Sequence, residues 1–336
     1  MCPRDLDISS IAPINQRNPR LIVVSYSSWE ISKRNSDSSN SLRTLIFRTI
    51  AVPLALAASI LSIELAHGDN ASPLPRPDHI VLVFEENHAY SQIINSPDAP
   101  YTNRLAAQGA LFTQSFGLTH PSQPNYLALF SGSTQSITDN SCPHSFTTPN
   151  LGHALLAAGL TFAGYSEDLP SVGSIVCSEG HYARKHNPWV NWQDSAANGL
   201  TTTTNLPMTS FPTEYNALPT VSIVVPNQMN DMHSGKDSEM IRAGDRWLRD
   251  RLDAYVQWAQ QHNSLFIVTW DEDNGKENNR IATLFIGPMV QTGHYGQRIT
   301  HYNVLRTIED LYGLSHSGAS AVAAPILHIW KSAPRP

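Results

Sequence analysis

The chain alternates between short apolar runs and longer segments in which apolar residues recur at helical spacing. Five β-rich runs stand out, at residues 79–84, 161–165, 220–225, 265–270 and 282–286. Continuous apolar runs of this length are typical of strands that are buried on both faces of a parallel sheet. The runs therefore predict the strands of a central sheet.

Segments with helical periodicity lie between these runs. The clearest covers residues 240–262, where an apolar stripe lies opposite charged and amide residues. Shorter helical candidates cover residues 101–111, 125–130, 151–158 and 304–314. Because strands and helices alternate, the sequence predicts an α/β fold with a mainly parallel central sheet and helices on both of its faces.

The amino-terminal part of the chain has a different character. Residues 1–42 are polar and irregular, and we treat them as an extension of uncertain status. Residues 43–68 follow the order of a secretory signal peptide: arginines, an apolar run, then small and polar residues. A membrane anchor is the alternative, but the apolar run is short and contains Pro53. We expect a secreted or periplasmic protein that has no membrane span after signal cleavage, with a single domain over residues 76–335.

Composition and charge narrow the class of protein. A hydrophobic content of 41% with 15% charged residues fits a globular protein with a large core. The net charge of −6 and the lack of a basic stripe argue against nucleic acid as a partner. Cys142 and Cys177 remain after the signal segment and would form a disulfide in an oxidising compartment, the alternative being two buried thiols. Composition does not predict the oligomeric state.

Two acidic groups directly follow predicted strands. Glu86 and Asn87, followed by His88, come after the first run, and Asp271 and Glu272 come after the fourth. Carboxylate and amide oxygens are hard ligands that suit a divalent cation. Taken singly, each group is explained as well by a helix cap or a solvated turn. Ligands in open α/β sheets bind beyond the carboxyl ends of the strands, so the two groups together favour one metal site.

Ser122 lies in the stretch LTHPSQPNYLALFSGS, just before a predicted helix. A serine at a helix start has free N–H groups and the positive end of the helix dipole beside it, which favours an anionic substrate. The alternative is an ordinary N-cap serine. No G-x-S-x-G elbow is present, so a triad of the α/β-hydrolase type is poorly supported. A metal would activate the hydroxyl without a histidine base.

Other polar groups are ambiguous from sequence alone. Asp231 and His233 follow the third run, Lys185 and His186 lie in YARKHNPWV, and His301 precedes a predicted helix. Each suits a phosphate site or a proton donor, and each is also explained by a turn, a solvated loop or a helix cap.

In this order, the motifs resemble those of the phosphoesterase family that contains bacterial and fungal acid phosphatases and phosphatidylcholine-type phospholipases C, which are relatives of the alkaline phosphatase superfamily. The motifs that carry the resemblance are FEENHAYSQII, THPSQPNYLALFSG, YARKHNPWV, PNQMNDMH, TWDEDN and THYNVLRTIEDLYGL. They span residues 79–314, and the resemblance implies an alkaline-phosphatase-like α/β fold for the catalytic domain at residues 76–335.

The resemblance also implies roles for individual residues. It nominates Ser122 as the nucleophile and Asn125 as a donor to the phosphoryl oxygens. The implied metal ligands are Glu86, Asn87, Asp271 and Glu272. Further catalytic positions are His120, Asp231, His233 and His301, with Lys185 and His186 binding substrate. The wider superfamily often has Asp-His where this chain has Asp-Glu, which leaves the number and identity of the metal ions open.

These observations predict an exported, metal-dependent phosphoesterase, with an acid phosphatase that cleaves phosphomonoesters through a phosphoserine as the first hypothesis. The expected partner is a small phosphorylated molecule or a phospholipid head group. A phospholipase C or another phosphodiesterase is the alternative within the same chemistry. A noncatalytic surface protein that binds metal or phosphate, and a metal-free serine esterase, are alternatives from other classes.

Overall fold

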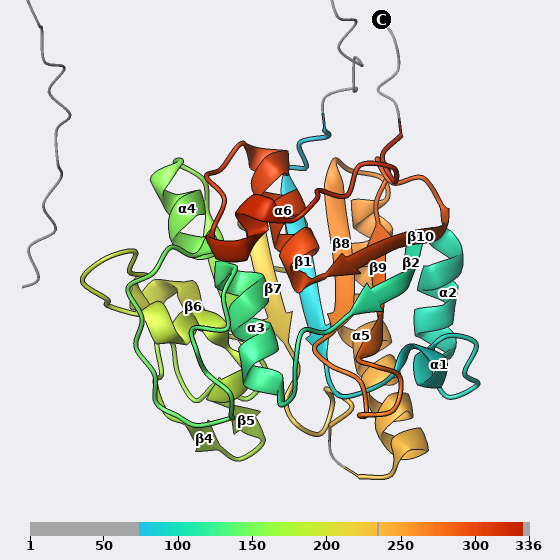
Figure 1. The fold of residues 1–336 in the computed structure, drawn as a ribbon, viewed down its shortest axis with the longest axis horizontal. Coiled ribbons are helices and arrows are strands. Elements are labelled where there is room, and N and C mark those ends of the chain that lie inside the picture. Colours follow the sequence, from blue (N-terminus) through green and yellow to red (C-terminus); the bar gives the residue numbers. More distant parts are fainter. Residues whose placement is uncertain (1–73, 234, 332–336) are drawn as a thin grey trace, which may run out of the picture. The chain divides into compact units, whose positions relative to one another are not determined.

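The computed structural model describes residues 74–233 and 235–331, which form a central sheet with helices on both faces (Figure 1). In these residues the sheet has eight strands in the order β10-β2-β9-β8-β1-β7-β3-β6. The strands are β1 (His79–Glu85), β2 (Ala110–Phe116), β3 (Phe162–Ser166), β6 (Asn205–Pro207), β7 (Val221–Val225), β8 (Ser264–Trp270), β9 (Arg280–Ile286) and β10 (Gly293–Thr300). A separate small hairpin consists of β4 (Ser178–Glu179) and β5 (Tyr182–Ala183).

Neighbouring strands are parallel except around β9, which is antiparallel to both β2 and β8. The predicted α/β class with a mainly parallel sheet is therefore confirmed. All five predicted strands are present, as β1, β3, β7, β8 and β9. Because β9 runs in the opposite direction, its carboxyl end lies at the other edge of the sheet from those of β1, β7 and β8.

The period-two alternation of strand side chains divides the core between the two faces. On β1, Ile80, Leu82 and Phe84 pack with helices α3, α4 and α6, whereas Val81 and Val83 pack with α1, α2 and α5. Figure 1 shows these two groups of helices on opposite sides of the sheet. The helices are α1 (Tyr90–Ile93), α2 (Pro100–Gln108), α3 (Ser122–Ser131), α4 (Leu151–Ala157), α5 (Asp237–Ala259) and α6 (His301–Tyr312). Short 3₁₀ turns include Arg184–His186 and Pro188–Trp192.

Two strands and one helix end differ from the sequence prediction. The helix predicted at 101–111 ends at Gln108, and residues 110–111 already belong to β2. A glycine at position 109 separates the two elements. Neither β2 nor β10 forms a continuous apolar run: β2 contains Thr113 and Gln114, and β10 is an edge strand with alternating exposure. Their polar content hides them from a search for buried strands.

Cys142 and Cys177 form a disulfide with an S–S distance of 2.14 Å, as the sequence predicts for an oxidising compartment. None of the helices in the described part of the chain combines the length and the apolar content that a membrane crossing requires. The predicted extension at 1–42 and the predicted signal peptide at 43–68 lie outside the described residues, as do the last residues of the predicted domain, so these remain predictions.

Gly164 on β3 allows a tryptophan to pack flat against the sheet. A Cβ at this position would lie 2.0 Å from Cε2 of Trp189, which is buried and donates its indole N–H to Asn205 Oδ1 at 2.9 Å. We expect Gly164→Ala to lower the free energy of unfolding by about 1–3 kcal/mol, because overpacking displaces the indole. Urea unfolding measures this loss. The matched control is Gly296→Ala, where no atom lies within 4 Å of the new Cβ; equal effects of the two substitutions would contradict the packing argument.

Candidate active site

Three acidic segments meet where β1, β7 and β8 end. These strands are parallel neighbours, and Glu85 at the end of β1 pairs with Trp270 at the end of β8. The pairing continues beyond the strands, since Asp271 N donates to Glu85 O at 3.0 Å and Glu86 N donates to Asp231 O at 2.8 Å. The backbone therefore brings Glu86, Asp231 and Asp271 to one point at the carboxyl edge of the sheet.

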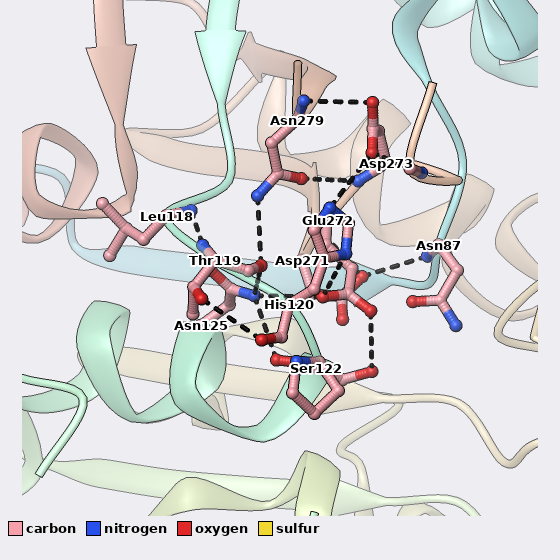
Figure 2. A network of polar contacts seen from close by, with 12 residues as sticks. Asn87, Leu118, Thr119, His120, Ser122, Asn125, Asp271, Glu272, Asp273 and Asn279 are labelled. Atoms are coloured by element: carbon pink, nitrogen blue, oxygen red, sulfur yellow. Dashed lines mark hydrogen bonds and ion pairs between the residues drawn. The ribbon is translucent and has the colours of Figure 1, made fainter. Parts of the chain in front are cut away.

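Ser122 is the first residue of α3 and lies beside Asp271 and Glu272 (Figure 2). Its Oγ donates to Glu86 Oε2 at 3.1 Å and lies 3.5 Å from Glu272 Oε1, and the residue is 1% exposed. The helix begins three residues before the predicted start at Asn125. The N-cap is Pro121, so the Ser122 hydroxyl is turned to carboxylates and does not cap the helix. This arrangement disfavours the N-cap interpretation.

Asn125 lies one turn further along α3 and holds the loop that precedes the helix. Its Oδ1 accepts from the backbone N–H groups of Leu118 and Thr119 at 2.8 and 3.2 Å. Its Nδ2 donates to Thr119 O at 2.8 Å and lies 3.4 Å from Glu272 Oε2 (Figure 2). The amide thus fixes the position of Ser122 relative to Glu272, and only its contact with Glu272 points toward the reacting groups.

The predicted metal ligands lie together around Ser122. Asn87 adopts a positive φ of 52°, which asparagine tolerates, and its N–H donates to Asp271 Oδ1 at 3.0 Å. Asn87 Oδ1 and Asp271 Oδ2 are buried oxygens with no hydrogen-bond partner among the described residues. Such orphaned oxygens suit a hard cation. In residues 74–233 and 235–331, no three His, Cys, Asp or Glu side chains are already arranged as a metal-ligand set.

Burial raises the pKa values of all three carboxyls beside Ser122. The pKa of Asp271 rises to about 7 and that of Glu272 to about 9, through burial first and, for Glu272, the nearby Asp271 charge second. Burial and the charge of Asp271 also hold the pKa of Glu86 well above its usual range. The positive charge of Lys185 lowers each of these pKa values.

Two histidines, His186 and His233, lie next to these acids. His186 is buried, with Nε2 3.1 Å from Glu86 Oε1 and Nδ1 3.4 Å from Asp231 Oδ2, although neither contact has hydrogen-bond geometry. Burial, and then the charge of Lys185, holds the pKa of His186 well below its usual range. The ring of His233 lies 6.2 Å from that of His186, and its backbone N–H donates to Asp231 Oδ1 at 2.8 Å. Burial raises the pKa of Asp231 to about 7.

His120 lies at the outer edge of the acidic group. Its Nδ1 is 3.0 Å from Glu272 Oε2 and its Nε2 is 3.3 Å from Asp273 Oδ1, and its side chain is 45% exposed. A surface pocket of about 360 Å³ adjoins it and is lined in part by Lys276. The structure therefore brings His120 to the mouth of the site.

His301 lies inside the protein, at the first turn of α6. Its Nε2 donates to Trp270 O at 3.0 Å, and its ring packs edge-on against Phe84 at 5.8 Å between centroids. Burial lowers its pKa to about 4. These contacts join α6 to the end of β8, directly before the acids. These contacts of the His301 ring are structural, and a catalytic role for His301 remains a prediction.

Sequence reasoning did not assign a site role to two side chains that contact Glu86, those of Tyr126 and His88. Tyr126 donates its hydroxyl to Glu86 Oε1, and its ring stacks on that of His186 with 5.1 Å between centroids. His88, buried next to Asn87, bonds through Nδ1 to Glu86 O at 2.9 Å. Tyr126 follows Ser122 by four residues, so helical spacing would have found it on the same face.

A rigid turn after β8 supports the site from the side of the solvent. Asp273 accepts hydrogen bonds from the backbone N–H groups of Gly275, Glu277 and Asn279 at 2.6, 2.6 and 3.0 Å. The Asn279 side chain then donates to Thr119 O at 3.1 Å, which links this turn to the loop before Ser122 (Figure 2). The turn was visible in the sequence as Asp-Asn-Gly, but its link to the Ser122 loop was not.

Solved structures with a similar fold come from the alkaline phosphatase superfamily. A superfamily member from Vibrio parahaemolyticus aligns with a TM-score of 0.53 at 13% identity, covering 76% of this chain and 72% of that one. The lipoteichoic acid synthase LtaP from Listeria monocytogenes aligns with a TM-score of 0.51 at 11% identity, covering 78% and 77%. These similarities concern the fold alone.

Sequence comparisons are more specific. The chain is 49% identical over 294 residues to a phosphatidylinositol-3-phosphatase of Mycobacterium tuberculosis, covering 85% of this chain and 95% of that protein. It is 28% identical over 243 residues to an acid phosphatase of Aspergillus fumigatus, covering 67% of this chain but only 53% of that protein. The model of the Phosphoesterase family matches residues 94–315. The chain therefore belongs to the Phosphoesterase family and is a hydrolase that acts on phosphoric esters.

Proposed function

We propose that the protein is an exported, metal-dependent acid phosphatase that hydrolyses phosphomonoesters through a phosphoserine at Ser122. The observation that carries the proposal is the buried Ser122 hydroxyl, which contacts Glu86 and Glu272 at the first turn of α3. The phosphatase names of the relatives support monoesters over the phospholipase C alternative. A lipid head group that carries a phosphomonoester falls within this substrate class.

The residues that would hold a divalent cation are Glu86, Asn87, Asp271 and Glu272. Their oxygens have the hard donor chemistry that such a cation requires, and two of them, Asn87 Oδ1 and Asp271 Oδ2, are buried without a hydrogen-bond partner in the described part of the chain. A bound cation would offset the repulsion between the buried carboxylates and lower the pKa of the neighbouring hydroxyl.

The chain's own groups would carry out the remaining chemistry. Ser122 Oγ attacks phosphorus in line as the ester P–O bond breaks and the alcohol leaves, and the serine proton passes to a carboxylate that already contacts it, Glu86 being closer than Glu272. The positive end of the α3 dipole and the ammonium of Lys185 stabilise negative charge on the phosphoryl oxygens. Water then attacks the phosphorus of the phosphoserine, the Oγ–P bond breaks, and inorganic phosphate leaves while Ser122 Oγ takes back its proton.

The groups considered for protonating the leaving oxygen differ in their surroundings. His301 is fully buried and its pKa falls to about 4, so it is neutral over most of the acid range. His233 is half-buried and bonded through its backbone to Asp231, whose pKa rises to about 7. An acid with a pKa near the working pH is the better proton donor. The Asp231–His233 pair is therefore preferred to His301.

Replacing the proposed nucleophile tests the mechanism directly. We expect Ser122→Ala to lower kcat on p-nitrophenyl phosphate by at least about 10³-fold, because the covalent route is lost. Ser133→Ala, just beyond the other end of the same helix, is the control and keeps the wild-type rate. Circular dichroism confirms that both variants fold. A Ser122→Ala rate within twofold of wild type would exclude Ser122 as the nucleophile. The phospholipase C alternative is tested separately, by comparing the wild-type rates on p-nitrophenyl phosphate and on phosphatidylcholine.

Removal of metal ions should abolish the phosphatase activity of the intact enzyme. After dialysis against a chelator we expect less than about 1% of the initial rate, since the Ser122 hydroxyl then loses the cation that would lower its pKa and neutralise the phosphoryl group. Adding back single divalent cations, assayed one at a time, should restore the rate with at least one of them. Full activity in protein shown by elemental analysis to be free of metal contradicts the proposed cation requirement.

The raised pKa values also predict how the metal-free protein responds to pH. The folded protein retains protons on Asp271 and Glu272 that the unfolded chain releases above about pH 4–5. Stability is therefore fully present at low pH and is lost as pH rises through about 7 and about 9. We expect Glu272→Gln to raise the unfolding temperature of the metal-free protein at pH 8, by about 2–4 °C per kcal/mol regained.

The matched control for this measurement is Glu179→Gln on the exposed hairpin strand β4. Differential scanning fluorimetry from pH 5 to pH 9 compares both variants with wild type. The expected pattern is a flatter decline with pH for Glu272→Gln alone. Identical curves for all three proteins would show that Glu272 is ionised without penalty in the folded protein.

A further inference from the structure

The start of α3, where Ser122 lies, has few backbone donors. An α-helix ordinarily leaves its first four N–H groups without a partner inside the helix. Here the N-cap is Pro121 and the third helical residue is Pro124. Proline has no N–H group, so the donors at this helix start are the N–H groups of Ser122 and Gln123. A phosphate bound at Ser122 therefore meets fewer backbone donors than a helix start usually provides.

A side chain from a distant loop occupies one of these donors. Gln123 N donates to Asn140 Oδ1 at 3.0 Å, and Asn140 lies on the loop between α3 and α4. Because a backbone N–H is a donor, the atom of the Asn140 amide that faces it is the carbonyl oxygen. The Gln123 N–H is therefore not available to a phosphoryl oxygen while this bond is present.

Asn140 brings its own donor to the place where it occupies one. Its Nδ2 is attached to the same carbon as Oδ1, so the bond to Gln123 also holds the NH₂ group at the start of α3. The Asn140 side chain is exposed, and its Nδ2 has no acceptor in residues 74–233 and 235–331. In contrast, Asn125 Nδ2 already donates to Thr119 O at 2.8 Å. The Asn140 amide therefore offers an unused donor next to the residue that follows Ser122.

The loop that carries Asn140 is attached to the opposite side of the site. Cys142, two residues after Asn140, forms the disulfide with Cys177. Arg184 is buried directly before the basic residues of the site, and its Nη2 donates to His144 O at 2.8 Å. These two attachments fix the loop on the carboxyl side of Asn140, while the bond to α3 fixes its side chain. A donor that is already held in place needs little rearrangement when charge develops on a substrate.

We propose that Asn140 Nδ2 donates a hydrogen bond to a phosphoryl oxygen of the substrate at Ser122, and that Asn140 is thus a further catalytic residue. This inference rests on the proposed function and deepens it by adding a group that contacts the phosphate. Charge on the phosphoryl oxygens is stabilised by donors aimed at them, and the neutral amide supplies such a donor without a proton to lose. The competing role is a helix cap, since Asn140 Oδ1 also satisfies an N–H at the start of α3.

Two substitutions separate the donor role from the cap role. Asn140→Asp keeps an oxygen for the Gln123 N–H but loses the NH₂ group, whereas Asn140→Ala loses both. At pH 6, where a surface aspartate is ionised, we expect each variant to lower kcat on p-nitrophenyl phosphate by about 10²-fold. Asn140→Ala alone should also lower the unfolding temperature. The control is Thr147→Asp, which adds the same charge to the same loop beside Asn198 and should keep the wild-type rate.

The other patterns of rates overturn the donor role. A normal rate for Asn140→Asp with a slow Asn140→Ala would make Asn140 a helix cap and nothing more. A slow Asn140→Asp with a normal Asn140→Ala would show that only the new charge matters. A faster Asn140→Ala would show that the wild-type amide has to leave before phosphate binds. Normal rates for both variants would place Asn140 outside the reaction.

Binding of inorganic phosphate separates this inference from the proposed function, because it requires no turnover. By isothermal titration calorimetry of the purified proteins, we expect Kd for phosphate to rise at least about 10-fold in both Asn140 variants and to change less than about threefold in Ser122→Ala. No binding by wild type, or equal affinity in the Asn140 variants, overturns the donor role even if phosphatase activity is confirmed. An active Ser122→Ala variant contradicts the proposed nucleophile and leaves the phosphate result unaffected.

Discussion

The structure depends on one electrostatic constraint, the burial of several carboxyl groups at the ends of three parallel strands. β1 and β8 are apolar along most of their length and are followed directly by acidic residues, and the loop after the apolar β7 reaches Asp231. Their parallel register leaves Glu86, Asp231 and Asp271 at one place, joined by backbone hydrogen bonds that continue past the strands. Charged carboxylates in such a place are stable only when they are protonated, paired or bound to a cation. In this site, burial raises the pKa values of Asp271 and Glu272 and so favours their protonated forms, while the hydroxyls of Ser122 and Tyr126 donate hydrogen bonds to Glu86.

The alternation of side chains along β1 decides which acid belongs to the site. Phe84 faces α3, so Glu86 lies on the same face and meets Ser122 and Tyr126. Glu85 points to the other face, where both of its oxygens are buried without a hydrogen-bond partner among the described residues and burial holds its pKa well above the usual range. Two adjacent glutamates thus have different environments because of the two-residue period of a strand.

The sequence predicted those parts of the molecule that local patterns encode. Apolar runs identified the central strands, and acids at strand ends identified the groups around Ser122, since both features are readable within a few residues. The direction of β9 and the existence of β10 depend on strand pairing between distant segments, which carries no local signal. For Asn125, which the resemblance assigns to phosphoryl binding, the structure adds hydrogen bonds that organise the loop before α3, and these bonds to the loop have no local sequence signal. His301 is placed by the packing of α6, which sequence periodicity does not resolve.

Protonation and cation binding are two ways to satisfy the same constraint. Among the groups that face the three carboxyls beside Ser122, Lys185 lowers the pKa of each, while burial and Lys185 keep His186 neutral. A single ammonium does not balance three carboxylates together with a phosphate dianion. Either protons occupy some of the carboxyls, which favours acid conditions, or a cation displaces those protons. In the proposed mechanism, proton and cation would compete for the same oxygens, and cation affinity would fall as the pH drops below the raised pKa values of Asp271 and Glu272. Under the proposed metal-dependent mechanism, the enzyme would work where enough protons are present to limit repulsion and enough carboxylate remains to hold a cation beside Ser122.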